Sequence, residues 1–317
     1  MTKAEIDNAC KDYENYMFER KKVGVDTFEY DNLKMFYKVV YFLKNGLEPW
    51  YDGMKFFIPR LDELSKADFI TKIKISDDFF KQINYNVDVE KFVRNGVVNP
   101  FDATLDFKKI SSYLKGHGQI NKDNGDIVFP NSGFALDLLI MIHEFGHAAN
   151  KTSDEKVKNI LSEASALYVE LQSYDYLSGI GYEREVKFMK SWRMKLLYED
   201  SKKYLTILSA LLSRKDVAFK GETDYYSLEM IKQEDFYKIE KMMNYMLGFP
   251  LAIYMYNMVK DDFSFSENIN TFNKNLADFT FEQSLNVIGI FDIKKDLIEK
   301  IPELIETYEN QRIKKMN

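Results

Sequence analysis

Cysteine and basic clusters are scarce in this chain of 317 residues, and each scarcity excludes a class of protein. The single cysteine, Cys10, cannot form a disulfide within the chain, which is typical of proteins from a reducing compartment. No basic stripe or arginine-rich run is present and the formal net charge is −6, so nucleic acid is not expected as a partner.

Long apolar segments are missing as well. The first twenty residues are polar and acidic, without the apolar core of a secretory signal. The longest apolar stretch, 134–149, is interrupted by Asp137, His143, Glu144 and His147, so it is too short and too polar to span a bilayer. We therefore expect a soluble, cytoplasmic protein without a membrane partner.

Hydrophobic residues make up 45% of the chain and include 25 Phe and 21 Tyr, enough for a large core. Apolar positions recur mainly at helical spacing. One expected helix starts after a cap at Asp26 and Thr27 and ends at Gly46. Other helices are expected over about 3–20, 77–85, 88–95 and 104–114.

The pattern changes after residue 114. Residues 115–120 and 126–129 predict two strands, joined by a hairpin turn at Asn124 and Gly125. Helices are then expected over about 133–150, 154–178, 182–213, 227–260 and 290–315, with shorter helices or loops in 261–289. The predicted fold class is mainly α with one small sheet. We expect residues 1–110 to form a helical N-terminal region and residues 111–317 to form a second region. Alternatively, both regions belong to one continuous domain.

The most informative motif is His143-Glu-Phe-Gly-His147, which holds two of the three histidines in the chain. In H-E-x-x-H on a helix, the two histidines lie four residues apart on one face, so both imidazoles can bind one metal ion. Glu144 is then placed to accept a proton from a metal-bound water. The motif predicts a hydrolytic zinc site.

A catalytic zinc site normally takes three protein ligands, and no histidine follows His147. The metzincin layout would need a ligand at Ser153 and a glycine at Asn150, so this layout is excluded. In the gluzincin layout the third ligand is a glutamate from the next helix. Glu163 and Glu170 are seven residues apart on one helix face, and either can reach the metal.

The HEFGH motif followed by Ala148, and then Glu163-Ala-Ser with Glu170 seven positions on, resembles the thimet oligopeptidase and oligopeptidase F family of zinc peptidases. Residues 127–131 and 136–138 are also similar to that family. The resemblance implies a zincin-like (gluzincin) catalytic domain with one Zn²⁺ per chain. It also implies that Glu163 is the metal ligand and that Glu170 supports the site.

The chain departs from that family in three respects. The serine follows Glu163 by two residues instead of three, the gap from His147 to Glu163 is shorter, and the chain has about half the usual length. The carboxypeptidase Taq family shares the HEFGHA motif. The same two histidines and one glutamate would also suit Mn²⁺ or Co²⁺.

The family presents a histidine and tyrosines to the reaction intermediate from a Gly- and Tyr-rich helix start. Residues 245–256 are similar but contain no histidine. Because a tyrosine hydroxyl can stabilise an oxyanion, Tyr245 is the first candidate for this role, followed by Tyr254 and Tyr256. His117 is a candidate substrate-binding residue, since extended peptides pair with exposed strand edges.

These features predict a zinc-dependent metallopeptidase in which Glu144 is the general base and oligopeptides are the substrates. One alternative is a protease specific for a single protein substrate. A second alternative is a zinc-stabilised binding module without catalytic activity. The intact Glu144 argues against the module, because a structural zinc site closes its fourth position and needs no general base.

Overall fold

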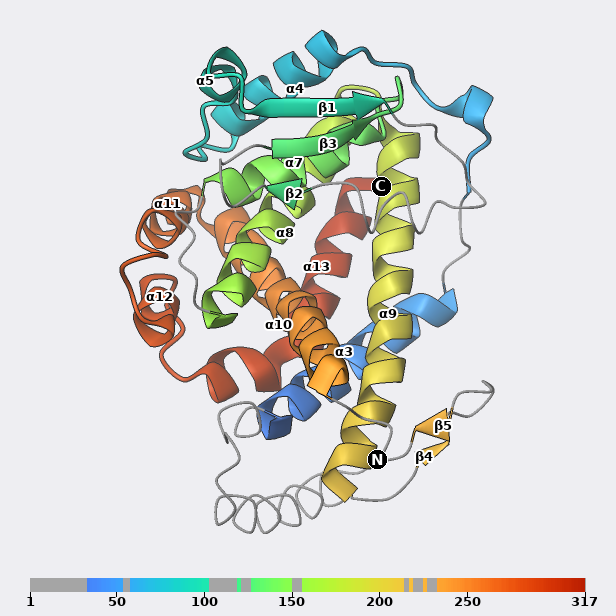
Figure 1. Cartoon of the computed structure of the whole chain (residues 1–317), viewed down its shortest axis with the longest axis vertical. Coiled ribbons are helices and arrows are strands. Elements are labelled where there is room, and N and C mark those ends of the chain that lie inside the picture. Colours follow the sequence, from blue (N-terminus) through green and yellow to red (C-terminus); the bar gives the residue numbers. More distant parts are fainter. Residues whose placement is uncertain are drawn as a thin grey trace.

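The computed structural model describes residues 33–53, 58–102, 119–120, 127–149, 156–213, 217–218, 225–226 and 233–316. The described chain is mainly helical with a small sheet at one end, which confirms the predicted fold class at this level (Figure 1). The predicted helices over 3–20 and 104–114, the cap at Asp26 and Thr27, and the boundary at residue 110 lie outside the described residues.

The long helices match the predicted pattern closely, and the segment 261–289 consists of short helices as expected. The α-helices are α3 (Leu33–Gly53), α4 (Phe69–Gln82), α5 (Val89–Arg94), α7 (Asp137–Ala148), α8 (Lys156–Gly179), α9 (Glu183–Ser213), α10 (Gln233–Asp261), α11 (Ser266–Lys274), α12 (Phe281–Val287) and α13 (Ile301–Met316). Short 3-10 helices are η1 (Leu61–Glu63), η3 (Phe263–Phe265) and η5 (Ile298–Lys300), and η4 (Ile293–Leu297) is a π-helix.

Three helix boundaries differ from the prediction. Helix α3 continues past Gly46, where a Cβ would lie 2.7 Å from Ile305 Cδ1 of α13, so this glycine permits helix packing and does not end the helix. Helix α4 begins at Phe69, because the Asp68 side chain caps it by accepting a hydrogen bond from the Thr71 amide (2.8 Å). The predicted helix over 290–315 is divided into η4, η5 and α13.

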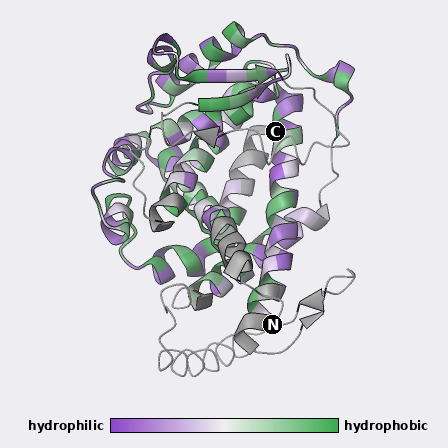
Figure 2. Cartoon of the chain, viewed as in Figure 1, coloured by the Kyte–Doolittle hydropathy of each residue, from purple (hydrophilic) through white to green (hydrophobic). Residues whose placement is uncertain are grey.

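The main sheet has the strand order β1-β3-β2. Its central strand β3 (Ile127–Asn131) pairs in antiparallel fashion with β2 (Gln119–Ile120), which confirms the predicted pairing of these two strands. Strand β1 (Val98–Asp102) pairs with β3 in parallel and was not predicted, because its sequence VNPFD contains proline and lies on an exposed edge. Figure 2 shows β3 as largely hydrophobic, whereas hydrophilic residues interrupt β1. Strands β4 (Val217–Ala218) and β5 (Tyr225–Tyr226) form a separate pair.

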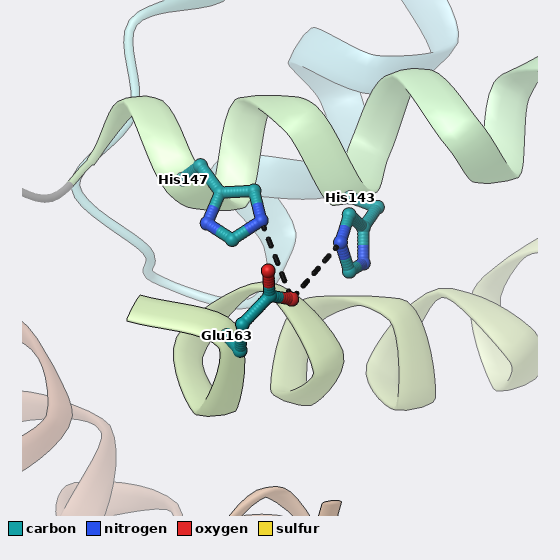
Figure 3. A group of neighbouring side chains, drawn as sticks. All are labelled: His143, His147 and Glu163. Atoms are coloured by element: carbon teal, nitrogen blue, oxygen red, sulfur yellow. Dashed lines mark ion pairs between the residues drawn. The ribbon is translucent and has the colours of Figure 1, made fainter. Parts of the chain in front are cut away.

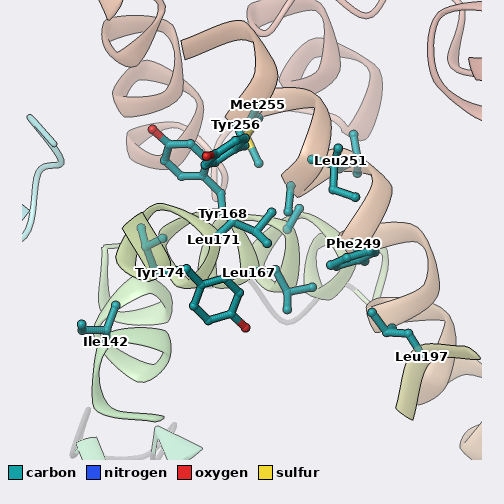
Figure 4. Close-up of a cluster of buried hydrophobic side chains, with 14 of the residues drawn as sticks. Ile142, Leu167, Tyr168, Leu171, Tyr174, Leu197, Phe249, Leu251, Met255 and Tyr256 are labelled. Carbon is teal, nitrogen blue, oxygen red and sulfur yellow. The ribbon is translucent and has the colours of Figure 1, made fainter. Parts of the chain in front are cut away.

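The core surrounds α8, which packs against α7 and α10. Figure 4 shows buried side chains from α7, α8, α9 and α10 that meet in this layer, among them Ile142, Leu167, Leu197 and Phe249. Helix α3 packs against α9 and α13, and its buried residues join the same hydrophobic cluster. Helix α8 therefore presents one face to α7 and another to α10. None of the described helices is long and apolar enough to cross a membrane.

Candidate metal centre

Helix α7 carries the HEFGH motif through the interior, and an ion pair fixes its first residue. Lys72 Nζ of α4 lies 2.6 Å from Asp137 Oδ2, and both side chains are fully buried. The same carboxylate accepts hydrogen bonds from the backbone amide (2.7 Å) and the hydroxyl (2.9 Å) of Ser132. Lys72 also donates to Asn131 Oδ1 at the end of β3 (3.0 Å). These contacts tie the start of α7 to both α4 and the sheet.

Gly146, the glycine of HEFGH, allows α7 and α8 to approach closely. A Cβ at this position would lie 2.6 Å from Val169 Cγ2 and 2.8 Å from Ala166 Cα, both on α8. Gly248 of α10 has a related role, because a Cβ there would lie 3.3 Å from Glu163 Cβ. Two glycines thus allow α7 and α10 to pack closely against α8.

Three side chains from α7 and α8 converge on one point (Figure 3). The Nε2 atoms of His143 and His147 lie 3.7 Å and 3.6 Å from the same atom, Glu163 Oε2. One ligand atom of each residue lies within 4.8 Å of the others. In tetrahedral zinc sites, bonds of about 2.0–2.1 Å place neighbouring ligand atoms about 3.3 Å apart, so the donor set and its spacing suit such an ion.

Glu170, the other candidate third ligand, lies on the opposite side of the His143 ring. Its Oε2 atom is 3.1 Å from His143 Nδ1, and its Oε1 atom accepts a hydrogen bond from the Tyr174 hydroxyl (2.6 Å). Arg193 of α9 donates to both carboxylate oxygens, from Nε to Oε1 (2.9 Å) and from Nη2 to Oε2 (2.6 Å). The structure therefore brings Glu163 to the Nε2 atoms and places Glu170 behind the His143 ring.

His147 has a neutral partner in the corresponding position. Its Nδ1 atom lies 3.0 Å from the Ser162 hydroxyl, on the residue that precedes Glu163 in α8. Both imidazoles thus use Nδ1 for a contact within the protein and direct Nε2 toward Glu163. A metal-binding histidine usually makes such a contact through its other ring nitrogen, which orients the ring.

Burial dominates the electrostatics of the two histidines and of Glu144. It lowers the pKa of His147 to about 4, and it lowers the pKa of His143 although the Glu170 hydrogen bond acts in the opposite direction. Both imidazoles are consequently neutral near pH 7, as metal binding requires. Burial and then the negative charge of Glu163 raise the pKa of Glu144 to about 8. A divalent cation beside Glu163 would oppose this increase, because positive charge favours a carboxylate.

For Glu170, neighbouring groups outweigh the effect of burial on the pKa. Its burial by itself raises the pKa, but the positive charge of Arg193 and the His143 hydrogen bond outweigh burial and hold the pKa well below the usual range. Glu170 is therefore an anion in the protein interior, where a carboxylate needs a cation and several hydrogen bonds. Arg193 provides that cation.

The three candidate tyrosines occupy different places. The charge of Glu163, followed by burial, raises the pKa of Tyr245 well above its usual value, so this hydroxyl shares the electrostatic environment of the site. The Tyr254 hydroxyl donates to the Ile288 carbonyl (3.1 Å), and the Tyr256 hydroxyl donates to Asp175 Oδ2 (2.8 Å). The structure does not bring these two hydroxyls to the candidate centre.

The oxyanion role of Tyr254 and Tyr256 stays a prediction. Their hydroxyls bind partners from distant segments, which periodicity does not reveal. His117, the candidate substrate-binding residue, lies outside the described residues. Among the described residues, sequence reasoning missed Arg193, Tyr174 and the role of Ser162. Only Tyr174 had a local signal, because it follows Glu170 by four residues on α8.

Comparisons of the chain with models of known protein families, with curated proteins and with solved structures give no match.

Proposed function

We propose that the protein is a zinc-dependent metallopeptidase with a zincin-like catalytic domain of the gluzincin layout. One observation carries the proposal: the Nε2 atoms of both HEFGH histidines lie within 3.7 Å of a single oxygen of Glu163, which comes from the next helix. The resemblance of HEFGH and the later glutamates to the thimet oligopeptidase and oligopeptidase F family supports the same layout. His143, His147 and Glu163 would hold one Zn²⁺ per chain.

The bound metal would supply a Lewis acid that polarises the scissile carbonyl and makes water more acidic. Glu144 follows His143 in the sequence and is buried, and the charge of Glu163 contributes to its raised pKa, which supports a position close to that carboxylate. In this proposal Glu144 accepts the proton of the attacking water and passes it to the leaving amine. Its burial excludes bulk water, which strengthens these charge interactions.

Tyr245 is the proposed donor to the oxyanion. Its half-buried side chain responds to the charges of Glu163 and Glu144, whereas Tyr254 and Tyr256 are hydrogen-bonded elsewhere. A hydroxyl kept protonated by surrounding negative charge can donate a hydrogen bond to the developing oxyanion. We propose peptides or proteins in the cytoplasm as substrates.

The direct test is Glu144→Gln, with Glu282→Gln on the exposed surface of α12 as the matched control. The Glu144 variant should keep one zinc per chain and lose about 100-fold or more of its peptide hydrolysis, because the general base is absent. The control should keep both. Hydrolysis that persists at the wild-type rate in Glu144→Gln excludes the mechanism.

The identity of the third ligand needs a second variant. Glu163→Ala should lose bound zinc, because it removes the carboxylate whose Oε2 atom lies near both Nε2 atoms. Stoichiometric zinc in this variant would instead assign the ligand role to Glu170.

A quenched-peptide library, with and without a chelator, distinguishes the proposed oligopeptidase from its alternatives. Chelator-sensitive cleavage of short peptides supports the oligopeptidase. Bound zinc without any peptide cleavage indicates a protease that is specific for one protein or a binding module. Cleavage of a single protein substrate would then separate these two.

A further inference from the structure

Arg193 reaches the candidate centre from a third helix. It lies within α9, its side chain is 14% exposed, and it faces Glu170 of α8. The guanidinium donates from Nε to Oε1 (2.9 Å) and from Nη2 to Oε2 (2.6 Å). Such a two-point contact fixes the plane of a carboxylate as well as its position, which a lysine cannot do.

The hydrogen bonds that Glu170 receives from its other partners indicate that it also accepts a hydrogen bond from His143. Two guanidinium N–H groups and the Tyr174 hydroxyl (2.6 Å) all donate to this carboxylate, so it acts as an acceptor. The His143 Nδ1 atom, 3.1 Å from Oε2, must then carry the hydrogen. A neutral imidazole has one N–H, so the lone pair of His143 is on Nε2, which faces Glu163.

The corresponding contact of His147 is made with an uncharged group. Its Nδ1 atom lies 3.0 Å from the Ser162 hydroxyl, and a hydroxyl can either donate or accept a hydrogen bond. The two candidate ligands therefore differ at Nδ1: a charged network that includes Arg193 contacts this atom of His143, and the uncharged Ser162 hydroxyl contacts it in His147.

We propose that Arg193 is a positioning residue that acts through Glu170 to set the tautomer and the orientation of His143, and thereby the metal affinity of the centre. It also keeps both oxygens of Glu170 engaged, so that Glu163 and not Glu170 completes the ligand set. The effect on metal affinity rests on the proposed metal site. The effect on the His143 tautomer does not, because it follows from hydrogen bonds within the protein.

The first test is ¹⁵N NMR of the histidine rings in the metal-free full chain. The chain has three histidines, so a substitution of His117 is enough to begin their assignment. The wild-type chain should show His143 with its hydrogen on Nδ1. Arg193→Met should shift His143 toward the Nε2–H form, whereas Lys195→Met, at a partly exposed position two residues later in α9, should leave it unchanged. An unchanged His143 tautomer in Arg193→Met overturns the proposal.

The second test is zinc affinity by competition with a chelator. Arg193→Met should bind zinc about 10-fold to 100-fold more weakly than the wild type, as observed when partners of metal ligands are removed. Lys195→Met should remain within about 2-fold of the wild type. When Glu170→Met is already present, Arg193→Met should change the affinity by less than about 2-fold, because its effect passes through Glu170. A full additional loss in this background contradicts the proposal.

If Arg193→Met does not fold, Arg193→Lys provides the same test. Lysine keeps the charge but not the two-point contact, so the His143 tautomer and the zinc affinity should shift in the same direction by a smaller amount. Wild-type values for both would overturn the proposal.

A wild-type chain that binds zinc but cleaves no peptide would refute the proposed function only. A chain that binds no zinc would refute the metal site, while the NMR test would still decide the role of Arg193.

Discussion

Two buried ion pairs lie along α7, one at its first turn and one beside the face that carries His143 and His147, and the two pairs have different structural roles. At the first turn, Lys72 and Asp137 pair with both side chains fully buried, and Ser132 adds two further hydrogen bonds. Beside His143, Arg193 pairs with Glu170, whose side chain is 2% exposed. The first carboxylate belongs to α7 itself and anchors the helix, whereas the second belongs to α8 and contacts an imidazole of α7.

The comparison shows that a buried ion pair can fix either the start of a helix or the orientation of a single side chain. Lysine is a point charge that needs no fixed orientation, which suits an anchor for a helix start. Arginine holds a carboxylate in a defined plane, which suits a carboxylate that must orient a ring. Substitutions at the two pairs, at the candidate metal centre and at the α7–α8 contact should therefore have different effects on stability and on zinc binding.

Lys72→Met should reduce the free energy of unfolding by about 3–5 kcal/mol, because it leaves Asp137 as an unpaired buried charge. Urea denaturation in the presence of a chelator measures this effect. Lys74→Met, at an exposed position of the same helix, is the control and should be nearly neutral. The folded Lys72 variant should bind zinc better than Arg193→Met does. If Lys72→Met lowers zinc affinity as strongly, the two pairs do not have separate roles.

Removal of zinc should lower the stability of the wild type by about 2.7 kcal/mol, relative to protein with free zinc at 100 times its dissociation constant. The physical reason is that the folded site binds the ion and the unfolded chain does not. Denaturation with and without chelator measures the difference. His147→Ala should show no such difference, and an equal loss in this variant would place the bound metal elsewhere.

Gly146→Ala should destabilise the chain by about 1–3 kcal/mol, because the added methyl group would overlap Val169 and the backbone of Ala166. Gly179→Ala, at the end of α8 with no atom within 4 Å of the added Cβ, is the matched control and should be neutral or stabilising. Thermal unfolding of both variants provides the measurement. Equal stability would show that α7 and α8 can separate at the centre at no cost.

Ser162→Ala should weaken zinc binding by about 2-fold to 10-fold, since one neutral hydrogen bond is worth about 0.5–1.5 kcal/mol. This loss should be smaller than that of Arg193→Met, because His147 has an uncharged partner. Chelator competition measures both variants, and Ser264→Ala on the exposed η3 segment serves as the control. A larger loss for Ser162→Ala would reverse the proposed order of the two histidines.

Local patterns predicted most of the long helices, because amphipathic spacing and terminal residues depend on neighbours in the sequence. They failed where a residue serves a distant contact. Gly46 predicts a helix end, but in the structure it accommodates Ile305 of α13. Strand β1 lacks a strand pattern because most of its residues are exposed, and its pairing with β3 defines it.

The same contrast between local patterns and distant contacts applies to the candidate site. The sequence by itself determined that His143 and His147 share a helix face, and that Glu163 and Glu170 share another, because residues four or seven apart are set by the helix repeat. The packing of α8 against α7 decided that Glu163 faces both Nε2 atoms while Glu170 lies behind His143. The position of α9 decided that Arg193 meets Glu170. The helix repeat is a property of the local backbone, whereas these contacts depend on how complete helices pack in three dimensions.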